Sequence, residues 1–317
     1  VMHTVNDDYY PFYRTIDLQM VSEVKSYTTD GQPLFYLYPI RFDNRKYTSE
    51  AGNKGRQGNA ADAEAICGSV GDGWRLPTAS ELLMSYVYIN ALGGNALDNS
   101  YYNGQNIYGW YQNWTGNYWS SSYYTAAGPA TRFSLEISTG YPYSEPADDT
   151  KYFRCVRDNN KSGTKYPYLS GKTIISRDAA GGVQSSVLLG SESPSQSNKV
   201  APKLEVDLTS SVGNWTTANS VCTAKGWRLP TQREMLLILS MGGGTIPLTQ
   251  GTGFSNTTAW SSGFQAIAGF HWTQTLHSGS NYYAINPSNG TNGYEQNAWD
   301  VATGPDWMNY RCVRTVN

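Results

Sequence analysis

The four cysteines are the residues whose chemistry would matter most. Free thiolates bind soft metal ions and act as nucleophiles, whereas paired cysteines form disulfides. The chain of 317 residues contains an even number of cysteines, four, together with 25 tyrosines and 32 glycines. This composition favours disulfides formed in an oxidising compartment, with buried free thiols as the alternative.

Aromatic side chains interleaved with amides suggest a second kind of chemistry, the binding of a ligand by stacking. Aromatic faces stack on sugar rings or apolar protein surfaces, and amides form hydrogen bonds with hydroxyls. The alternative is that these aromatic residues pack into their own loops. In the second half the candidate ligand-binding residues are Trp272, Trp299 and Trp307. In the first half they are Tyr101, Tyr102, Asn106, Tyr108, Trp110, Tyr111 and Trp114.

Catalytic and metal-binding groups are not arranged in a recognisable pattern. His271 and His277 lie six residues apart without an acidic partner at a suitable spacing, which argues against a zinc site or a catalytic triad. The adjacent acids Asp148 and Asp149 could hold a calcium ion, but a solvated turn is the simpler interpretation. We therefore predict a non-catalytic protein with no cofactor and no metal ion.

The charge balance narrows the expected partners. The 23 Lys and Arg residues nearly balance the 25 Asp and Glu residues, and no basic cluster occurs along the chain. Such a surface lacks the field that attracts a phosphate backbone, so we expect no nucleic-acid partner. The sequence contains no stretch of 18 apolar residues, so we predict no transmembrane segment. Because the sequence begins at Val1, we expect a leader or an upstream segment to precede it.

An internal repeat divides the chain into two halves. Three short motifs occur twice and in the same order, which indicates a duplication. We predict two domains, residues 1–160 and 161–317, and expect β-structure of the first domain in residues 1–50. The motifs are Trp-Arg-Leu-Pro-Thr at 74–78 and 227–231, Trp-Ser-Ser at 119–121 and 260–262, and Arg-Cys-Val-Arg at 154–157 and 311–314.

The spacing of the motifs predicts loops that differ between the halves. If Trp260 corresponds to Trp119, the interval from the first motif is 45 residues in one half (119 − 74) and 33 in the other (260 − 227). The first half would then carry about twelve extra residues before its Trp-Ser-Ser strand. We expect from this that the two halves bind different ligands.

Local patterns predict two helices and several short strands in each half, an α+β fold class. Residues 61–67 and 215–222 have helical composition and each segment ends at a cysteine. A threonine followed three residues later by a glutamate is a capping box, which begins a second helix at Thr78 and again at Thr231. Alternating apolar residues then predict hairpin strands around Phe133 and Tyr283.

The second cysteine of each half lies in the expected last strand. The simplest pairing therefore joins the first helix to the last strand, Cys67 to Cys155 and Cys222 to Cys312. Closing loops of 88 and 90 residues (155 − 67 and 312 − 222) removes on the order of 4–5 kcal/mol of chain entropy from the unfolded state.

The repeated motifs resemble those of bacterial C-type-lectin-like modules, which carry W-R-L-P-T-x-x-E, a later W-S-S strand and a terminal R-C-V-R strand. The resemblance covers most of both halves. It implies two tandem C-type-lectin-like domains, each with two helices packed on short antiparallel strands and one disulfide from the first helix to the last strand. Residues 171–182 and 199–203 further resemble C-terminal regions of fimbrillin-like surface proteins of gut anaerobes, some of which look like pilus-tip adhesins.

This resemblance implies an exported protein at the cell surface, outer membrane or fimbrium of a Gram-negative bacterium. Its expected partners are a glycan or a host surface protein, and other fimbrial subunits. One alternative is a structural fimbrial subunit without a ligand of its own. The other is a formylglycine-generating oxidase, a family with a similar R-L-P-T-x-x-E block, whose chemistry requires free thiols that hold copper.

Overall fold

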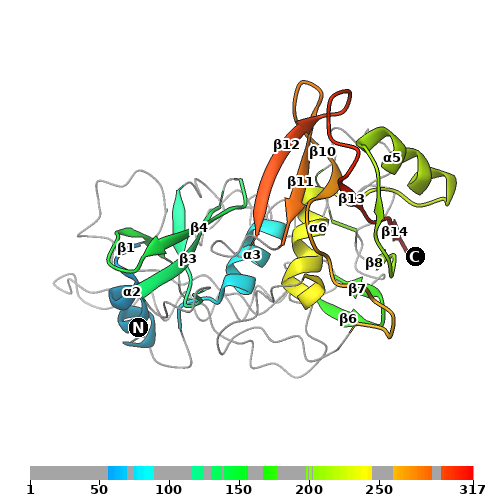
Figure 1. Cartoon of the computed structure of the whole chain (residues 1–317). Coiled ribbons are helices and arrows are strands. Elements are labelled where there is room, and N and C mark those ends of the chain that lie inside the picture. Colours follow the sequence, from blue (N-terminus) through cyan, green and yellow to red (C-terminus); the bar gives the residue numbers. More distant parts are fainter. Residues whose placement is uncertain are drawn as a thin grey trace, which may run out of the picture.

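The computed structural model has a mixed α+β architecture with more strands than helices (Figure 1). It describes residues 56–69, 75–88, 116–123, 130–137, 139–153, 155, 167–176, 198, 200–201, 203–244, 260–287 and 294–316. The expected β-structure of residues 1–50 lies outside these ranges. The elements of the first half are β1 (Arg56–Gly58), α2 (Ala60–Ser69), α3 (Ala79–Tyr88), β2 (Asn117–Trp119), β3 (Thr131–Glu136), β4 (Tyr141–Pro146) and β5 (Lys151–Phe153).

The second half repeats these elements and adds others. A small sheet, in the order β14-β8-β7-β6, lies beside the repeated part, and a π-helical turn, η5, extends the second helix. The elements are β6 (Tyr168–Ser170), β7 (Thr173–Ile175), β8 (Lys203–Val206), β9 (Ser211–Val212), α5 (Trp215–Ala224), α6 (Gln232–Ile238), η5 (Leu239–Gly243), β10 (His271–Ser278), β11 (Asn281–Asn286), β12 (Glu295–Asp300), β13 (Asn309–Tyr310) and β14 (Val313–Thr315).

The two five-stranded sheets have the same strand order. The first is β1-β5-β2-β3-β4, and the second, followed from its other edge, is β9-β13-β10-β11-β12. In both sheets one parallel pair interrupts the antiparallel ladder, β2 with β5 and β10 with β13. The expected hairpin strands are β3 with β4 and β11 with β12. The duplication visible in the motifs is therefore also a duplication of topology.

Identical caps begin the first helix of each half. The Asn59 side chain accepts a hydrogen bond from the backbone N–H of Asp62 at 2.8 Å, and the Asn214 side chain accepts one from Thr217 at 2.9 Å. Each bond satisfies a backbone donor that the helix leaves unpaired at its N-terminus. The helices α2 and α5 run two residues past the cysteines at which the sequence pattern ends them.

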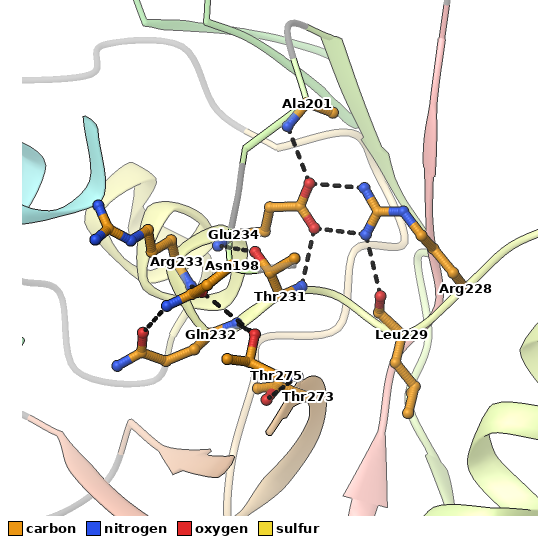
Figure 2. Close-up of polar contacts among 10 residues, drawn as sticks. All are labelled: Asn198, Ala201, Arg228, Leu229, Thr231, Gln232, Arg233, Glu234, Thr273 and Thr275. Carbon is orange, nitrogen blue, oxygen red and sulfur yellow. Dashed lines mark hydrogen bonds and ion pairs between the residues drawn. The ribbon is translucent and has the colours of Figure 1, made fainter. Parts of the chain in front are cut away.

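The capping box predicted for the second helix is confirmed in both halves. In α6 the Thr231 hydroxyl accepts from the N–H of Glu234 at 3.1 Å, and the Glu234 carboxylate accepts from the N–H of Thr231 at 2.9 Å (Figure 2). The corresponding bonds of Thr78 and Glu81 are 3.3 Å and 2.8 Å. The helical path is broken at Gly242, within η5, whose φ of +79° is a left-handed conformation that glycine adopts without strain.

The arginine of each Trp-Arg-Leu-Pro-Thr motif completes the cap. Arg228 forms a two-bond ion pair with Glu234, with N–O distances of 2.6 Å and 2.7 Å, as Figure 2 shows. Arg75 forms the same pair with Glu81, with both distances 2.7 Å. The arginine therefore has a structural role, because its guanidinium fixes the carboxylate that caps the helix.

The structural counterpart of Trp119 is Trp272, not Trp260, which corrects the motif alignment. The Trp119 indole N–H donates to the Gly58 carbonyl at 2.9 Å, and the Trp272 indole N–H donates to the Gly213 carbonyl at 3.0 Å. Trp119 and Trp272 differ by 153 residues (272 − 119), the same offset as the Trp-Arg-Leu-Pro-Thr motifs. The interval after that motif is therefore equal in both halves, and the extra twelve residues expected in the first half do not exist.

Both predicted disulfides are confirmed. Cys67 is bonded to Cys155 and Cys222 to Cys312, so no cysteine of the chain is free. All four are buried, and each bridge ties the first helix of its half to the segment after the last strand of its sheet.

One hydrophobic core runs through both halves. It includes Leu83 and Val87 of α3 and Leu236 of α6, and these helices lie side by side between the two sheets (Figure 1). A second, smaller cluster belongs to the second half alone and surrounds Trp272, beneath α5.

Candidate binding surface

The ten predicted ligand-binding residues fall into three groups in the structure. Seven of them, in the segment 101–114, lie outside the described residues. Trp272 is fully buried in the second core cluster, so its prediction as a ligand-binding residue was wrong. Trp299 is partly exposed at the end of β12, and Trp307 is 60% exposed in the loop that follows. Trp299 and Trp307 remain candidates.

Trp299 belongs to an aromatic cluster that the sequence analysis did not find. Its ring meets Phe270 edge-on, with the centroids 4.8 Å apart, and lies 6.2 Å from the buried Trp272. Beside it, Trp215 of α5 and Tyr282 of β11 pack with their ring centroids 4.2 Å apart. We call Trp215, Phe270, Tyr282 and Trp299, all of them partly exposed around the buried Trp272, the aromatic cluster.

Strand register explains why these side chains lie together. Tyr282 is paired directly with Trp299 across β11 and β12, and Ala284 with Asn297, so the four side chains share one face of the sheet. Trp272 on β10 is paired with Ala284 and occupies the same face. The small Ala284 leaves room for the Trp272 indole beneath the partly exposed rings.

The loop 301–308 carries Trp307 and lies against the buried Trp272. Asp300 begins the loop by accepting hydrogen bonds from the N–H groups of Ala302 at 2.7 Å and Thr303 at 3.2 Å. Gly304 lies against Trp272, since a side chain at this position would approach the indole to about 3.0 Å. The loop therefore covers the edge of the buried indole and leaves the Trp307 ring exposed to solvent.

The first half carries different chemistry at the corresponding positions. The shared caps and strand registers match Trp215 with Ala60, Phe270 with Asn117, Tyr282 with Arg132 and Trp299 with Glu145. Arg132 forms an ion pair with Glu64 at 3.1 Å, and Glu145 forms one with Lys151 at 3.3 Å. The aromatic cluster is thus a property of the second half and not a requirement of the fold.

A buried polar network lies next to the aromatic cluster, around His271. Its Nδ1 donates to the Gly269 carbonyl at 2.9 Å, because a carbonyl can only accept, and its Nε2 accepts from the Ser210 hydroxyl at 2.8 Å. Arg311 donates to the same hydroxyl through Nε at 3.1 Å and through Nη2 at 2.9 Å. Sequence spacing could not reveal this network, because Ser210 and His271 are 61 residues apart.

The Ser210 hydroxyl and the His271 ring lie as close together as a catalytic nucleophile and its general base. The surroundings of this pair nevertheless indicate a structural role. The Ser210 hydroxyl donates one hydrogen bond and accepts two, which uses its full capacity. Both His271 and Arg311 are 1% exposed, and Arg311 also donates to the carbonyls of Asp207 and Gln265. The network joins the loop before β9 to the loop before β10, which carries Phe270.

Acid is expected to destabilise this network. Burial, with the neighbouring Arg311 cation as a smaller cause, lowers the pKa of His271 from 6.5 to about 4. The folded state therefore favours neutral His271, and this stabilisation is complete above pH 6.5 and is lost as the pH falls toward 4. Between pH 7 and pH 5 we expect a loss of about 2 kcal/mol, measured by urea unfolding at each pH.

Substitutions of histidine separate this effect from other titrations. His271→Gln should lose less stability than the wild type between pH 7 and pH 5, whereas His277→Gln, which changes an exposed histidine, should behave like the wild type. Equal losses in the wild type and in His271→Gln would contradict the assignment.

Two other kinds of functional feature, a metal site and a membrane-spanning helix, have no support in the described part of the chain. No group of three or more His, Cys, Asp or Glu residues there is arranged to hold a metal ion. Asp149 pairs with Lys151 at 3.4 Å, and its neighbour Asp148 is exposed. Within the same described ranges, no helix has the length and apolar character needed to cross a membrane.

Comparison with models of protein families found no match, and comparison with curated proteins found none either.

Proposed function

We propose that this chain is a non-catalytic binding protein of the bacterial cell surface, an adhesin or fimbrial-tip-like subunit built from two tandem C-type-lectin-like modules. Its ligand is a glycan or a host surface protein, and the aromatic cluster with Trp307 is the binding surface. The two disulfides are compatible with export. A copper-dependent oxidase of the formylglycine-generating type is disfavoured, since all four cysteines are paired.

The observation that carries the proposal is the difference between the two halves. The first half has the same sheet topology as the second, but at the four positions of the aromatic cluster it carries Ala60, Asn117, Arg132 and Glu145. Packing alone therefore does not demand these rings. Partly exposed tryptophan and tyrosine offer large, rigid surfaces for stacking on sugar rings or apolar side chains.

Polar groups beside the rings suit a ligand with hydroxyls. The Asn297 side chain lies on the same strand face as Trp299, and it donates to Glu295 at 2.6 Å. An amide and a carboxylate next to an aromatic surface provide both donors and acceptors, which neutral sugars require. We therefore place glycans first among the ligands to be tested.

Binding is expected to depend on Trp299 and Trp307. Screening the full chain on a glycan array, followed by calorimetry with the best glycan, should show that Trp307→Ala raises the Kd at least tenfold, the scale of a binding hot spot. Trp299→Ala should have a similar effect. Tyr123→Ala, which removes an exposed aromatic residue of the first half, should leave the Kd unchanged and serves as the matched control.

A further variant distinguishes the two candidate surfaces. If the triple change Tyr108→Ala, Trp110→Ala and Tyr111→Ala abolishes binding while Trp299→Ala and Trp307→Ala do not, the ligand site lies in the first half and the aromatic cluster is not the site.

A further inference from the structure

The second helices of the two halves meet at a contact that contains a set of hydrogen-bonded polar groups beside the shared hydrophobic core. Helix α3 lies against α6, and edge strand β4 lies near edge strand β12, so counterpart elements of the duplication face each other. At the centre is Gln232, the first residue of α6, which is 1% exposed. Its counterpart in the first half is Ala79, which cannot make the same bonds.

The Gln232 amide bonds to the first half through both of its ends. Its Oε1 accepts from the Tyr86 hydroxyl at 2.7 Å, and its Nε2 donates to the Thr139 carbonyl at 3.1 Å. Within the second half it is held by the Asn198 side chain at 2.7 Å, as Figure 2 shows, and by Gln296. A buried amide satisfied on both sides fixes one relative position of the two halves, because any displacement would leave polar atoms unpaired.

Arg233, the next residue, binds the end of α3. Its Nη1 donates to the Tyr86 carbonyl at 2.6 Å and to the Val87 carbonyl at 3.3 Å, and its guanidinium lies 4.5 Å from the centre of the Tyr86 ring. These carbonyls belong to the last turn of α3, where a cation also interacts favourably with the helix dipole. Arg233 is partly buried in this contact, and this burial lowers the pKa of its guanidinium.

The β3–β4 turn forms the third part of the contact. The Gly140 carbonyl accepts hydrogen bonds from the Tyr294 hydroxyl and from the Gln296 amide of the second half. Gly140 has a φ of +69°, and a side chain there would overlap the Tyr86 ring. Glycine at this position thus allows the turn, the Tyr86 ring and the second half to come together.

We infer that the surface of α6 and β12 in the second half is a docking site for the first half, and that the two halves form one rigid, cooperatively folding unit. The hydrophobic core that continues through α3 and α6 supports the polar contact with apolar burial. This inference does not depend on the proposed ligand. It means that any surface of the first half is held at a fixed distance and angle from the aromatic cluster.

Cutting the chain between the halves tests the inference directly. Each disulfide lies within one half, so a protease site inserted between Lys161 and Ser162 would leave no covalent link after cleavage. We expect the cleaved wild type to elute as a single complex in size-exclusion chromatography. Two separate fragments from the cleaved wild type would overturn the inference.

Variants identify the contact that holds the halves together. Gln232→Ala with Arg233→Ala should raise the Kd between the cleaved halves at least tenfold, and Gln232→Ala alone should weaken it less. The matched control, Gln274→Ala with Arg132→Ala, changes a buried glutamine and a mostly buried arginine that make none of these bonds, and it should leave the complex intact. In calorimetry of the uncut chain, we expect one unfolding transition for the wild type and two for the double variant. Two unfolding transitions for the wild type would contradict a cooperative unit.

Discussion

Replacing Cys222 and Cys312 together with alanine is expected to lower the free energy of unfolding by about 4–5 kcal/mol. The bridge closes a loop with a sequence separation of 90 residues, and its main effect in the chain-entropy account is to restrict the unfolded state. A loss of this size is comparable with the whole stability of many domains. Guanidinium unfolding of the variant and the wild type, both without reductant, measures it.

The first-half bridge provides the comparison. Cys67→Ala with Cys155→Ala opens a loop of similar length, with a sequence separation of 88 residues, so its effect should be similar. Adding reductant to the wild type should remove the stability contributed by both bridges. A wild type whose unfolding midpoint does not change on reduction would contradict the prediction.

Removal of the Glu234 carboxylate is the second change expected to have a large effect. Glu234 is fully buried and accepts hydrogen bonds from Arg228, from the N–H of Thr231 and from the N–H of Ala201 at 3.0 Å. Glu234→Ala leaves a mostly buried guanidinium and two backbone donors without this acceptor. Breaking one partner of such a buried pair costs about 3–5 kcal/mol, which urea unfolding would detect.

An exposed ion pair in the same half serves as the control. Lys225 and Asp207 lie 3.4 Å apart, with Lys225 about half exposed, so Lys225→Ala should change the stability by less than about 1 kcal/mol. Glu81→Ala, the equivalent change in the first half, should destabilise as strongly as Glu234→Ala. Similar effects of Lys225→Ala and Glu234→Ala would show that the cap network contributes little.

Features set by local rules were predictable from the sequence. The capping boxes at Thr78 and Thr231 need only a threonine and a glutamate three residues apart, and they occur in the structure as expected. The disulfide pairing followed from the order of helix and strand in each half. The hairpin strands followed from alternating apolar residues such as Phe133 and Leu135, both of which are buried.

Features set by contacts between distant segments were not predictable. Trp260 and Trp119 are both followed by two serines, which suggested that they correspond. The structural position of Trp119 is instead defined by the hydrogen bond from its indole to a glycine 61 residues earlier. Trp272 makes the equivalent bond although threonine and glutamine follow it. Phe270 and Tyr282 of the aromatic cluster were missed for the same reason, since strand pairing, and not spacing along the chain, brings them to Trp299. Alignment of the halves at the offset of 153 residues between the two Trp-Arg-Leu-Pro-Thr motifs would have paired Trp119 with Trp272.

The contact between the halves distributes its bonding groups unequally, and this has an evolutionary consequence. On the first-half side the acceptors are mainly backbone carbonyls, those of Tyr86, Val87, Thr139 and Gly140, whereas the second half supplies side chains. A substitution at Val87 or Thr139 leaves the backbone carbonyl of that residue in place, so the first half can change at these positions while its bonds to the second half persist.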